Sequence, residues 1–198
     1  MGLESNAPGA TPLDQDEAAG LIPGHITTQA QLNAWEQSNI LKGERWALSR
    51  RSANSPEKLL SIDFAKQLHR RMFGETWKWA GDFRLTEKTI GIAPHEISVA
   101  LHNLLEDVKT QLQCKAYPLD EIAARLHHRM VYIHPFPNGN GRHSRLMADL
   151  LLVARGAARF TWGGKNIATA GDARKQYIFA LQAADDKDNG PLLAFVRS

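Results

Sequence analysis

The chain has 198 residues, a formal net charge of +3 at pH 7 and a single cysteine, Cys114. This length suits one domain with its own hydrophobic core, and one cysteine excludes both an internal disulfide and a cysteine zinc site. The sequence shows neither an apolar run as long as a membrane span nor a secretory signal, so we expect a cytoplasmic protein with no membrane partner.

The N-terminal part is predicted to be a short tail followed by a helix. Residues 1–10 are small and polar, so we expect a disordered tail before a single domain that spans residues 11–198. A helical extension is predicted at about 27–50, where apolar residues recur at helical spacing. Thr27 or Thr28 is suited to cap it, because a threonine hydroxyl accepts a hydrogen bond from an unpaired N–H of the first turn.

Three further elements follow in the first half of the chain. Ser61 is expected to cap a second helix that stops at Gly74. The segment 85–92 is short and contains threonine and isoleucine, which favours a β-hairpin. After Pro94, a long apolar stripe that ends at Leu112 predicts another helix.

The second half is also predicted to be helical. Asp120 is expected to cap the helix that leads to His134, and helices over 169–184 and 191–196 complete the chain. The two isolated arginine pairs in the first half lack interleaved aromatic residues, so we expect no direct binding of nucleic acid. These patterns indicate a mostly α, single-domain protein.

The stretch 134–145 carries the strongest functional signal. It reads His-Pro-Phe-Pro-Asn-Gly-Asn-Gly-Arg-His-Ser-Arg and lies between two apolar segments with helical spacing. Gly139 and Gly141 permit a positive φ, so successive backbone N–H groups can turn inward. We therefore expect an anion site at the N-terminus of the second helix.

The side chains of the same stretch fit the handling of phosphate groups. Arg142 and Arg145 lie at i and i+3, on one helix face, where both can reach a phosphate chain. His134 is placed to take a proton from an incoming hydroxyl. Phe136 is apolar within a polar loop and is expected to anchor the loop in the core. The stretch predicts a phosphate-handling active site.

These twelve residues resemble the Fic family signature His-x-Phe-x-(Asp/Glu)-Gly-Asn-Gly-Arg-x-x-Arg at every fixed position except one, where Asn138 replaces a carboxylate. Residues 79–84 are similar to the segment that precedes the Fic flap. Residues 11–14 and 20–23 resemble the subgroup called mobile mystery protein B. The resemblance implies a Fic-type helical bundle with a short β-hairpin flap at about 85–92.

The resemblance implies a protein adenylyltransferase, a nucleotidyltransferase that moves AMP from ATP to a Ser, Thr or Tyr hydroxyl of a target protein. His134 would be the general base, Arg142 would neutralise the leaving group and Arg145 would grip the γ-phosphate. The nucleotide-binding residues that it implies are Gly139, Asn140, Gly141, Arg142 and Arg145.

The resemblance also assigns the flap to the target protein. An extended segment of the target would add to the flap's backbone edge as a strand. The flap residues expected to face the target are Thr86, Lys88, Thr89, Ile90 and Gly91.

Asn138 leaves the outcome of the reaction open. The family's carboxylate at this position holds Mg²⁺, and an asparagine oxygen binds a hard cation only weakly or through water. The Doc-like branch also has asparagine here and transfers a phosphoryl group, but it lacks the second loop glycine, which is present as Gly141. A Doc-like kinase or phosphotransferase toxin, or a weakened Fic fold that serves as a binding module, therefore stay alternatives.

The sequence leaves open whether regulation acts in cis or in trans. Fic enzymes are commonly restrained by a helix with the pattern (Ser/Thr)-x-x-x-Glu-(Gly/Asn), and no segment of this sequence satisfies it. The nearest segment, 38–43, has Lys42 in place of the glutamate, so we interpret it as an ordinary helix turn, with a modified inhibitory helix as the alternative. In the ordinary-helix case, a separate inhibitor protein or a helix-turn-helix partner, as in a toxin–antitoxin pair, would supply the restraint.

Overall fold

The computed structural model describes residues 14–49, 55–164 and 170–198, and the expected disordered tail lies outside these ranges. Helices dominate the described residues, and the only β feature among them is an isolated bridge between Leu21 and Trp77. The elements are α1 (Gln15–Ala18), α2 (Gln29–Ser49), α3 (Pro56–Leu59), α4 (Ile62–Phe73), the 3-10 turn η2 (Pro94–Glu96), α5 (Ile97–Cys114), α6 (Leu119–Ile133), α7 (Asn140–Ala154), α8 (Ala170–Asp185) and α9 (Gly190–Arg197).

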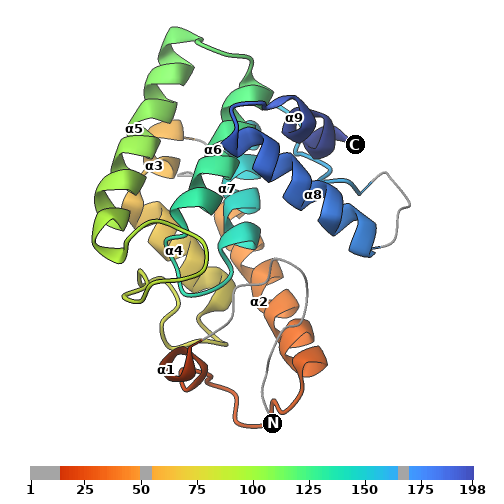
Figure 1. Cartoon of the computed structure of the whole chain (residues 1–198). Helices are drawn as coiled ribbons and strands as arrows, with labels where there is room; N and C mark the ends of the chain where they lie inside the picture. Colours follow the sequence, from red (N-terminus) through yellow and green to blue (C-terminus); the bar gives the residue numbers. More distant parts are fainter. Residues whose placement is uncertain (1–13, 50–54, 165–169) are drawn as a thin grey trace.

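The helices form a bundle around an antiparallel central pair, α6 and α7 (Figure 1). Helix α5 packs on one side of α6, helices α2 and α4 pack together beneath α7, and α8 and α9 cover the opposite side. Leu126 and Met130 of α6 and Met147 and Leu151 of α7 are fully buried between these layers. Within the ranges that the structure describes, no helix combines the length and apolar character that crossing a bilayer needs.

The local signals at two helix ends are confirmed. The Thr28 hydroxyl accepts a hydrogen bond from the Gln31 N–H at 3.2 Å, and the Gln31 side chain accepts one from the Thr28 N–H at 3.1 Å. This reciprocal pair is a capping arrangement at the start of α2. Ser61 accepts from the Phe64 N–H at 3.2 Å at the start of α4, and α4 ends at Gly74.

The predicted cap at Asp120 is wrong. Pro118 occupies the N-cap position of α6, and Asp120 lies in the first turn. The Asp120 carboxylate instead accepts a hydrogen bond from the Arg197 guanidinium of α9, with Nε and Oδ2 2.7 Å apart. A proline before a helix presets the backbone angle φ, and a bidentate arginine partner outcompetes a backbone N–H for the carboxylate.

The predicted β-hairpin at 85–92 is also wrong, because the structure has no strand in this segment. Arg84, which is 1% exposed, supplies the reason. Its guanidinium donates to the carbonyl of Thr86, at 2.8 Å, and to the carbonyl of Ile92. The buried guanidinium thereby binds carbonyl groups at both ends of the segment. The segment therefore folds as an irregular loop around it.

Candidate active site

His134 lies where α6 ends and the loop to α7 begins. Its backbone is in the left-handed region, with φ 53° and ψ 60°. Two contacts hold this unfavourable conformation: the His134 N–H donates to the Met130 carbonyl at 3.1 Å, and the His134 carbonyl accepts from Arg84 Nε at 2.6 Å. Strain of this kind persists where the surroundings over-determine the geometry.

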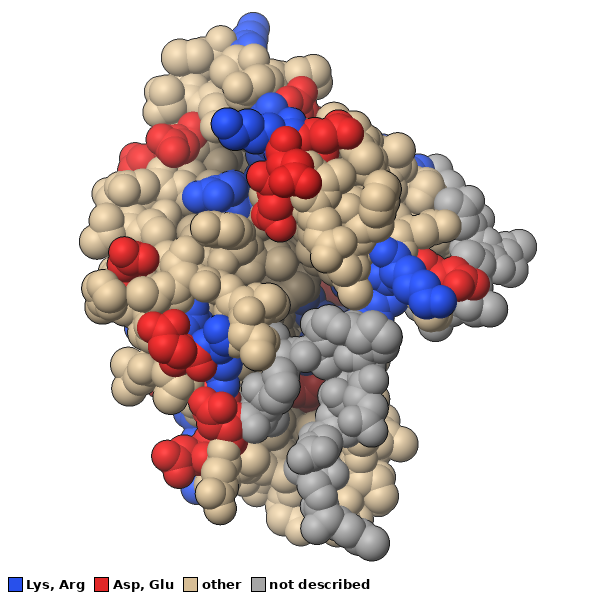
Figure 2. Space-filling model, viewed as in Figure 1, with Lys and Arg blue, Asp and Glu red and all other residues tan. Residues whose placement is uncertain are grey.

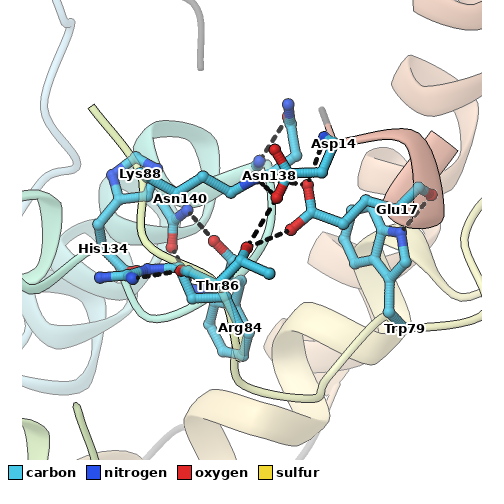
Figure 3. A network of polar contacts seen from close by, with 11 residues as sticks. Asp14, Glu17, Trp79, Arg84, Thr86, Lys88, His134, Asn138 and Asn140 are labelled. Carbon is cyan, nitrogen blue, oxygen red and sulfur yellow. Dashed lines mark hydrogen bonds and ion pairs between the residues drawn. The ribbon is translucent and has the colours of Figure 1, made fainter. Parts of the chain in front are cut away.

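The imidazole of His134 is neutral at pH 7. Burial lowers its pKa from 6.5 to about 4, because a charged ring loses its hydration there. The positive charges of Arg84 and Lys88 lower the pKa further, while a hydrogen bond to the backbone of Val131 opposes both effects. Figure 3 shows the side chains of His134, Arg84 and Lys88 close together. A neutral imidazole is the form that accepts a proton.

The loop is closed by its own residues. The Asn140 side chain accepts from the Phe136 N–H at 2.9 Å and donates to the Phe136 carbonyl at 2.7 Å. Both polar side-chain atoms of the predicted nucleotide ligand Asn140 therefore bind the loop itself. Its backbone N–H lies in the first turn of α7, where N–H groups have no partner within the helix. Phe136 is fully buried, as its predicted anchoring role requires.

His69 of α4 braces the loop from below. Its ring stacks on Phe136 with centroids 3.8 Å apart. Nδ1 accepts from the Gly81 N–H at 3.0 Å, so Nε2 carries the proton and donates to the Asn138 carbonyl at 3.0 Å. Burial holds the pKa of His69 well below its usual value. A neutral ring therefore fixes both the position and the direction of the loop.

The two loop glycines differ. Gly139 has φ +79°, and a Cβ there would lie 2.6 Å from the Phe73 ring, so both backbone and space require glycine. The expected positive φ at Gly141 is wrong, because Gly141 lies in the first turn of α7. A Cβ at Gly141 would meet the Tyr177 hydroxyl at 3.8 Å, an ordinary contact. No side chain caps this helix end, whose dipole favours an anion.

The two predicted phosphate arginines are held by different helices. Arg142 pairs with Glu36 of α2, with Nη1 and Oε2 2.6 Å apart, and its guanidinium lies 4.9 Å from the Phe73 ring centroid. Arg145 lies 4.7 Å over the ring of Tyr177 from α8. Their i, i+3 spacing places both residues on the same face of α7, but these contacts direct the two side chains toward different helices.

The flap segment 85–92 lies directly against the loop. A Cβ added to Gly91 would come within 2.7 Å of the His134 Cβ. Thr89, Ile90 and Gly91 are exposed beside it.

Helix α1 ties down the other end of the flap (Figure 3). The side chain of Lys88, which is 3% exposed, lies 2.9 Å from Asp14 and 2.5 Å from Glu17. The Thr86 hydroxyl donates to Asp14 at 2.8 Å. Two of the predicted docking residues, Thr86 and Lys88, are therefore engaged by the N-terminal segment.

The sequence assigned no role to several residues of the site. Glu36, Arg84 and Tyr177 reach the loop residues from 106, 50 and 32 positions away along the chain. Spacing and periodicity describe neighbours along the chain, so contacts across such distances leave no pattern in either.

A groove of about 810 Å³ lies elsewhere, between α5, α6 and the turn from α8 to α9. None of its lining residues belongs to the stretch 134–145. Figure 2 shows acidic and basic side chains intermixed on this view of the molecule, with no continuous stripe of one sign. In the groove, Nε2 of His128 lies 2.8 Å from Oδ1 of Asp185.

Comparison with known proteins agrees with this geometry. A sequence model of the Fic/DOC family matches residues 59–152, which include α4, α6 and most of α7. The chain is 26% identical over 167 residues to the protein adenylyltransferase Fic of Drosophila willistoni. That alignment covers 81% of this chain and 32% of the relative, so the chain spans about a third of the length of the curated protein that it matches.

Two solved structures share the fold. Fic-1 from C. elegans superimposes with a TM-score of 0.62 and 26% identity, over 91% of this chain and 51% of the other. BepC, a VirB-translocated effector from Bartonella tribocorum solved with bound AMPPNP, superimposes with a TM-score of 0.66 and 19% identity. That match covers 93% of this chain and 97% of BepC.

Proposed function

We propose, from the premise that residues 59–152 form a Fic/DOC-family domain, that the protein transfers AMP from ATP to a hydroxyl group of a target protein. The observation that carries the proposal is the neutral imidazole of His134, one loop away from the N-terminus of α7. A proton acceptor and an anion site at the two ends of one short loop supply what hydroxyl attack on a phosphate requires.

The steps follow from this arrangement. His134 takes the proton of the target hydroxyl, and the oxygen forms a bond with the α-phosphorus of ATP. The bond from the α-phosphorus to the bridging oxygen breaks, and pyrophosphate leaves with the electron pair. The backbone N–H groups of Asn140 and Gly141 hold the phosphates, Arg142 neutralises the leaving group, and Arg145 binds the γ-phosphate.

Relatives support the nucleotide. The Drosophila relative is named a protein adenylyltransferase, and the BepC structure holds AMPPNP, an ATP analogue. The space over Gly141, where an added Cβ meets only the Tyr177 hydroxyl at 3.8 Å, suits the close approach of a phosphate.

Mg²⁺ does not fit the residue expected to hold it. The Asn138 side-chain oxygen accepts from the Gly139 N–H at 2.6 Å and lies 3.4 Å from Nη2 of Arg142. A neutral oxygen that already accepts from one donor and faces a cation is a poor ligand for a hard divalent ion. We assign no step to a metal ion at Asn138.

We further propose that the target protein docks on the exposed flap residues 89–91, next to His134. The segment is not a strand, so the target binds a preformed loop and not a free sheet edge.

The segment nearest to an inhibitory motif, 38–43, bears on how the enzyme is restrained. Lys42, the residue in place of an inhibitory glutamate, pairs with Glu75 at 2.6 Å, which supports the interpretation of 38–43 as ordinary helix. We propose that a separate inhibitor or helix-turn-helix partner restrains the enzyme, as in a toxin–antitoxin pair. We also propose a cytoplasmic location and membership of the mobile mystery protein B subgroup.

Phosphoryl transfer is the second candidate, and Asn138 favours it because the Doc-like branch shares that residue. Incubation of a cell extract with the protein and ATP labelled at the α- or the γ-phosphate separates the two reactions. Protein-bound label from the α-position alone supports adenylylation, and label from the γ-position alone indicates a kinase. If neither label is transferred while ATP binds, the chain is a binding module.

A further inference from the structure

Glu36 of α2 is a buried carboxylate whose two oxygens have separate partners. Oε1 accepts from the indole Nε1 of Trp77 at 2.7 Å, and Oε2 lies 2.6 Å from Nη1 of Arg142. The side chain is 6% exposed. Glu36 lies on the inward stripe of α2, with Leu32 and Asn39.

The burial of Glu36 has a physical requirement. A carboxylate removed from water is tolerated only when a cation and hydrogen-bond donors replace its hydration. Trp77 and Arg142 are these replacements, and both belong to parts of the chain far from α2. Because each oxygen is already bound, Glu36 is not positioned to hold a substrate itself, and any effect on the reaction passes through Arg142.

Arg142 keeps the capacity to bind an anion in this pair. Its side chain is 37% exposed, and Glu36 contacts one terminal nitrogen, Nη1. The guanidinium lies 4.9 Å from the Phe73 ring centroid, and Nη2 is 3.4 Å from Asn138 Oδ1 in the loop. The ion pair and the ring fix the direction of a long side chain that would otherwise sample many rotamers.

We propose that Glu36, braced by Trp77, is the positioning residue that holds Arg142 beside the phosphate loop for the pyrophosphate end of ATP. The inference rests on the proposed function, because it assigns Arg142 to the leaving group. It adds a residue outside the signature, on a helix that precedes the matched family segment. Preorganisation of this kind reduces the entropy lost when the polyphosphate binds.

A double-mutant cycle tests the proposal. Glu36→Gln keeps the size and an acceptor for Trp77 but loses the charge, and Arg142→Ala removes the partner. The matched control is Glu44→Gln, which removes the same charge from the same helix, where Glu44 pairs with Arg159. Transfer of label from α-³²P-ATP, the affinity for ADP by calorimetry, and thermal unfolding are measured for each protein.

We expect Glu36→Gln to lower both transfer and ADP affinity by roughly tenfold, as loss of a supporting residue does, and Glu44→Gln to leave both within about twofold. In the Arg142→Ala background, Glu36→Gln should have almost no further effect, because coupled residues are not additive. Glu36→Asp, which restores the charge, should recover part of the loss.

Three results overturn the inference. The first is higher transfer or ADP affinity in Glu36→Gln, which would mean that Glu36 competes with the phosphates for Arg142. The others are fully additive losses in the cycle and equal losses in the Glu44 control. A chain that binds ADP but transfers no α-label refutes the proposed reaction, and the ADP cycle still decides the role of Glu36. A chain that binds no ADP refutes both.

Discussion

The active-site loop, residues 134–139, and the flap 85–92 lie against each other at His134, but they are held in different ways. The loop closes on itself, through the pair of hydrogen bonds between Asn140 and Phe136, four residues apart. The flap folds around the Arg84 guanidinium, and its Lys88 side chain binds Asp14 and Glu17 across more than 70 residues.

This difference suggests separate roles: the loop carries the proposed reaction, and the flap controls the access of the target protein to it. A loop fixed by its own hydrogen bonds and by the buried ring of His69 keeps its geometry whenever α4, α6 and α7 are packed. The flap depends on α1, a helix of four residues joined to it by polar contacts. Segments with few buried apolar contacts open at low free-energy cost. We therefore expect the loop to behave as fixed catalytic machinery and the flap to behave as a surface that can be released.

The largest expected effect comes from the loop. His134→Ala should lower transfer by a factor of roughly 10² to 10⁴, because the general base is lost, and should leave ATP affinity within about threefold. Label transfer from α-³²P-ATP and calorimetry measure the two quantities. His102→Ala, an exposed histidine of α5, is the control. Near-normal transfer in the His134 variant would show that this residue is not the base.

Acid should weaken the loop region before the flap. Burial lowers the pKa of His143 from 6.5 to about 4, so the unfolded chain binds a proton first as the pH falls. The stability that comes from a neutral His143 is complete above pH 6.5 and is lost toward pH 4, at about 1.4 kcal/mol per pH unit. Urea unfolding at pH 7 and pH 5 should therefore differ by about 2 kcal/mol from this histidine alone.

The flap contacts should survive the same change. Hydrogen bonds from Lys88 and Thr86 lower the pKa of Asp14 below 3.8, so Asp14 stays charged at pH 5. Hydrogen exchange at pH 5, corrected for the intrinsic rate, should show lost protection in α7 and unchanged protection at 85–92. The reverse order would break the comparison.

Arg145→Ala should weaken ATP binding by roughly 10- to 150-fold, the equivalent of 1.5–3 kcal/mol for a charge-assisted hydrogen bond. ADP affinity should change little, because Arg145 is assigned to the γ-phosphate. Calorimetry with both nucleotides measures the difference. Equal losses for ATP and ADP would remove Arg145 from the γ-phosphate.

Lys88→Met should release the flap and spare the loop. The substitution keeps the length of the side chain and removes the charge that binds Asp14 and Glu17. Cleavage within 85–92 by limited proteolysis should accelerate roughly tenfold, with ATP affinity within about twofold. The exposed Lys78→Met is the control. An ATP affinity that falls together with flap protection would mean that the two regions are one unit.

Asn138→Asp should have the smallest effect. It is isosteric, keeps an acceptor for the Gly139 N–H, and adds a charge near Arg142. We expect unfolding free energy within about 0.5 kcal/mol of the wild type and a lower Mg²⁺ concentration for half-maximal transfer, since carboxylates bind this ion better than amides do. A titration with Mg²⁺ at saturating ATP measures it. An unchanged or raised requirement would place Asn138 with the nucleotide.

Local patterns along the chain were enough to predict much of this fold. Thr28 and Ser61 cap helices as expected, because a cap involves residues three positions apart. The helical spacing on both sides of 134–145 predicts a loop between two helices for the same reason. The loop is shorter than expected, because α7 begins at Asn140 and takes up residues 140–145. The signature pointed to the family whose sequence model matches residues 59–152, since its residues are consecutive.

Contacts between distant segments settled the rest. Arg84 turned an expected hairpin into an irregular loop, and Arg197 drew Asp120 away from its expected cap. Glu36 reaches Arg142 across 106 residues, and the neutral state of His134 comes from burial among several helices. A side chain's hydration and its charged partners depend on which segments pack beside it. The order of residues along the chain does not show this packing, so only the folded structure decides it.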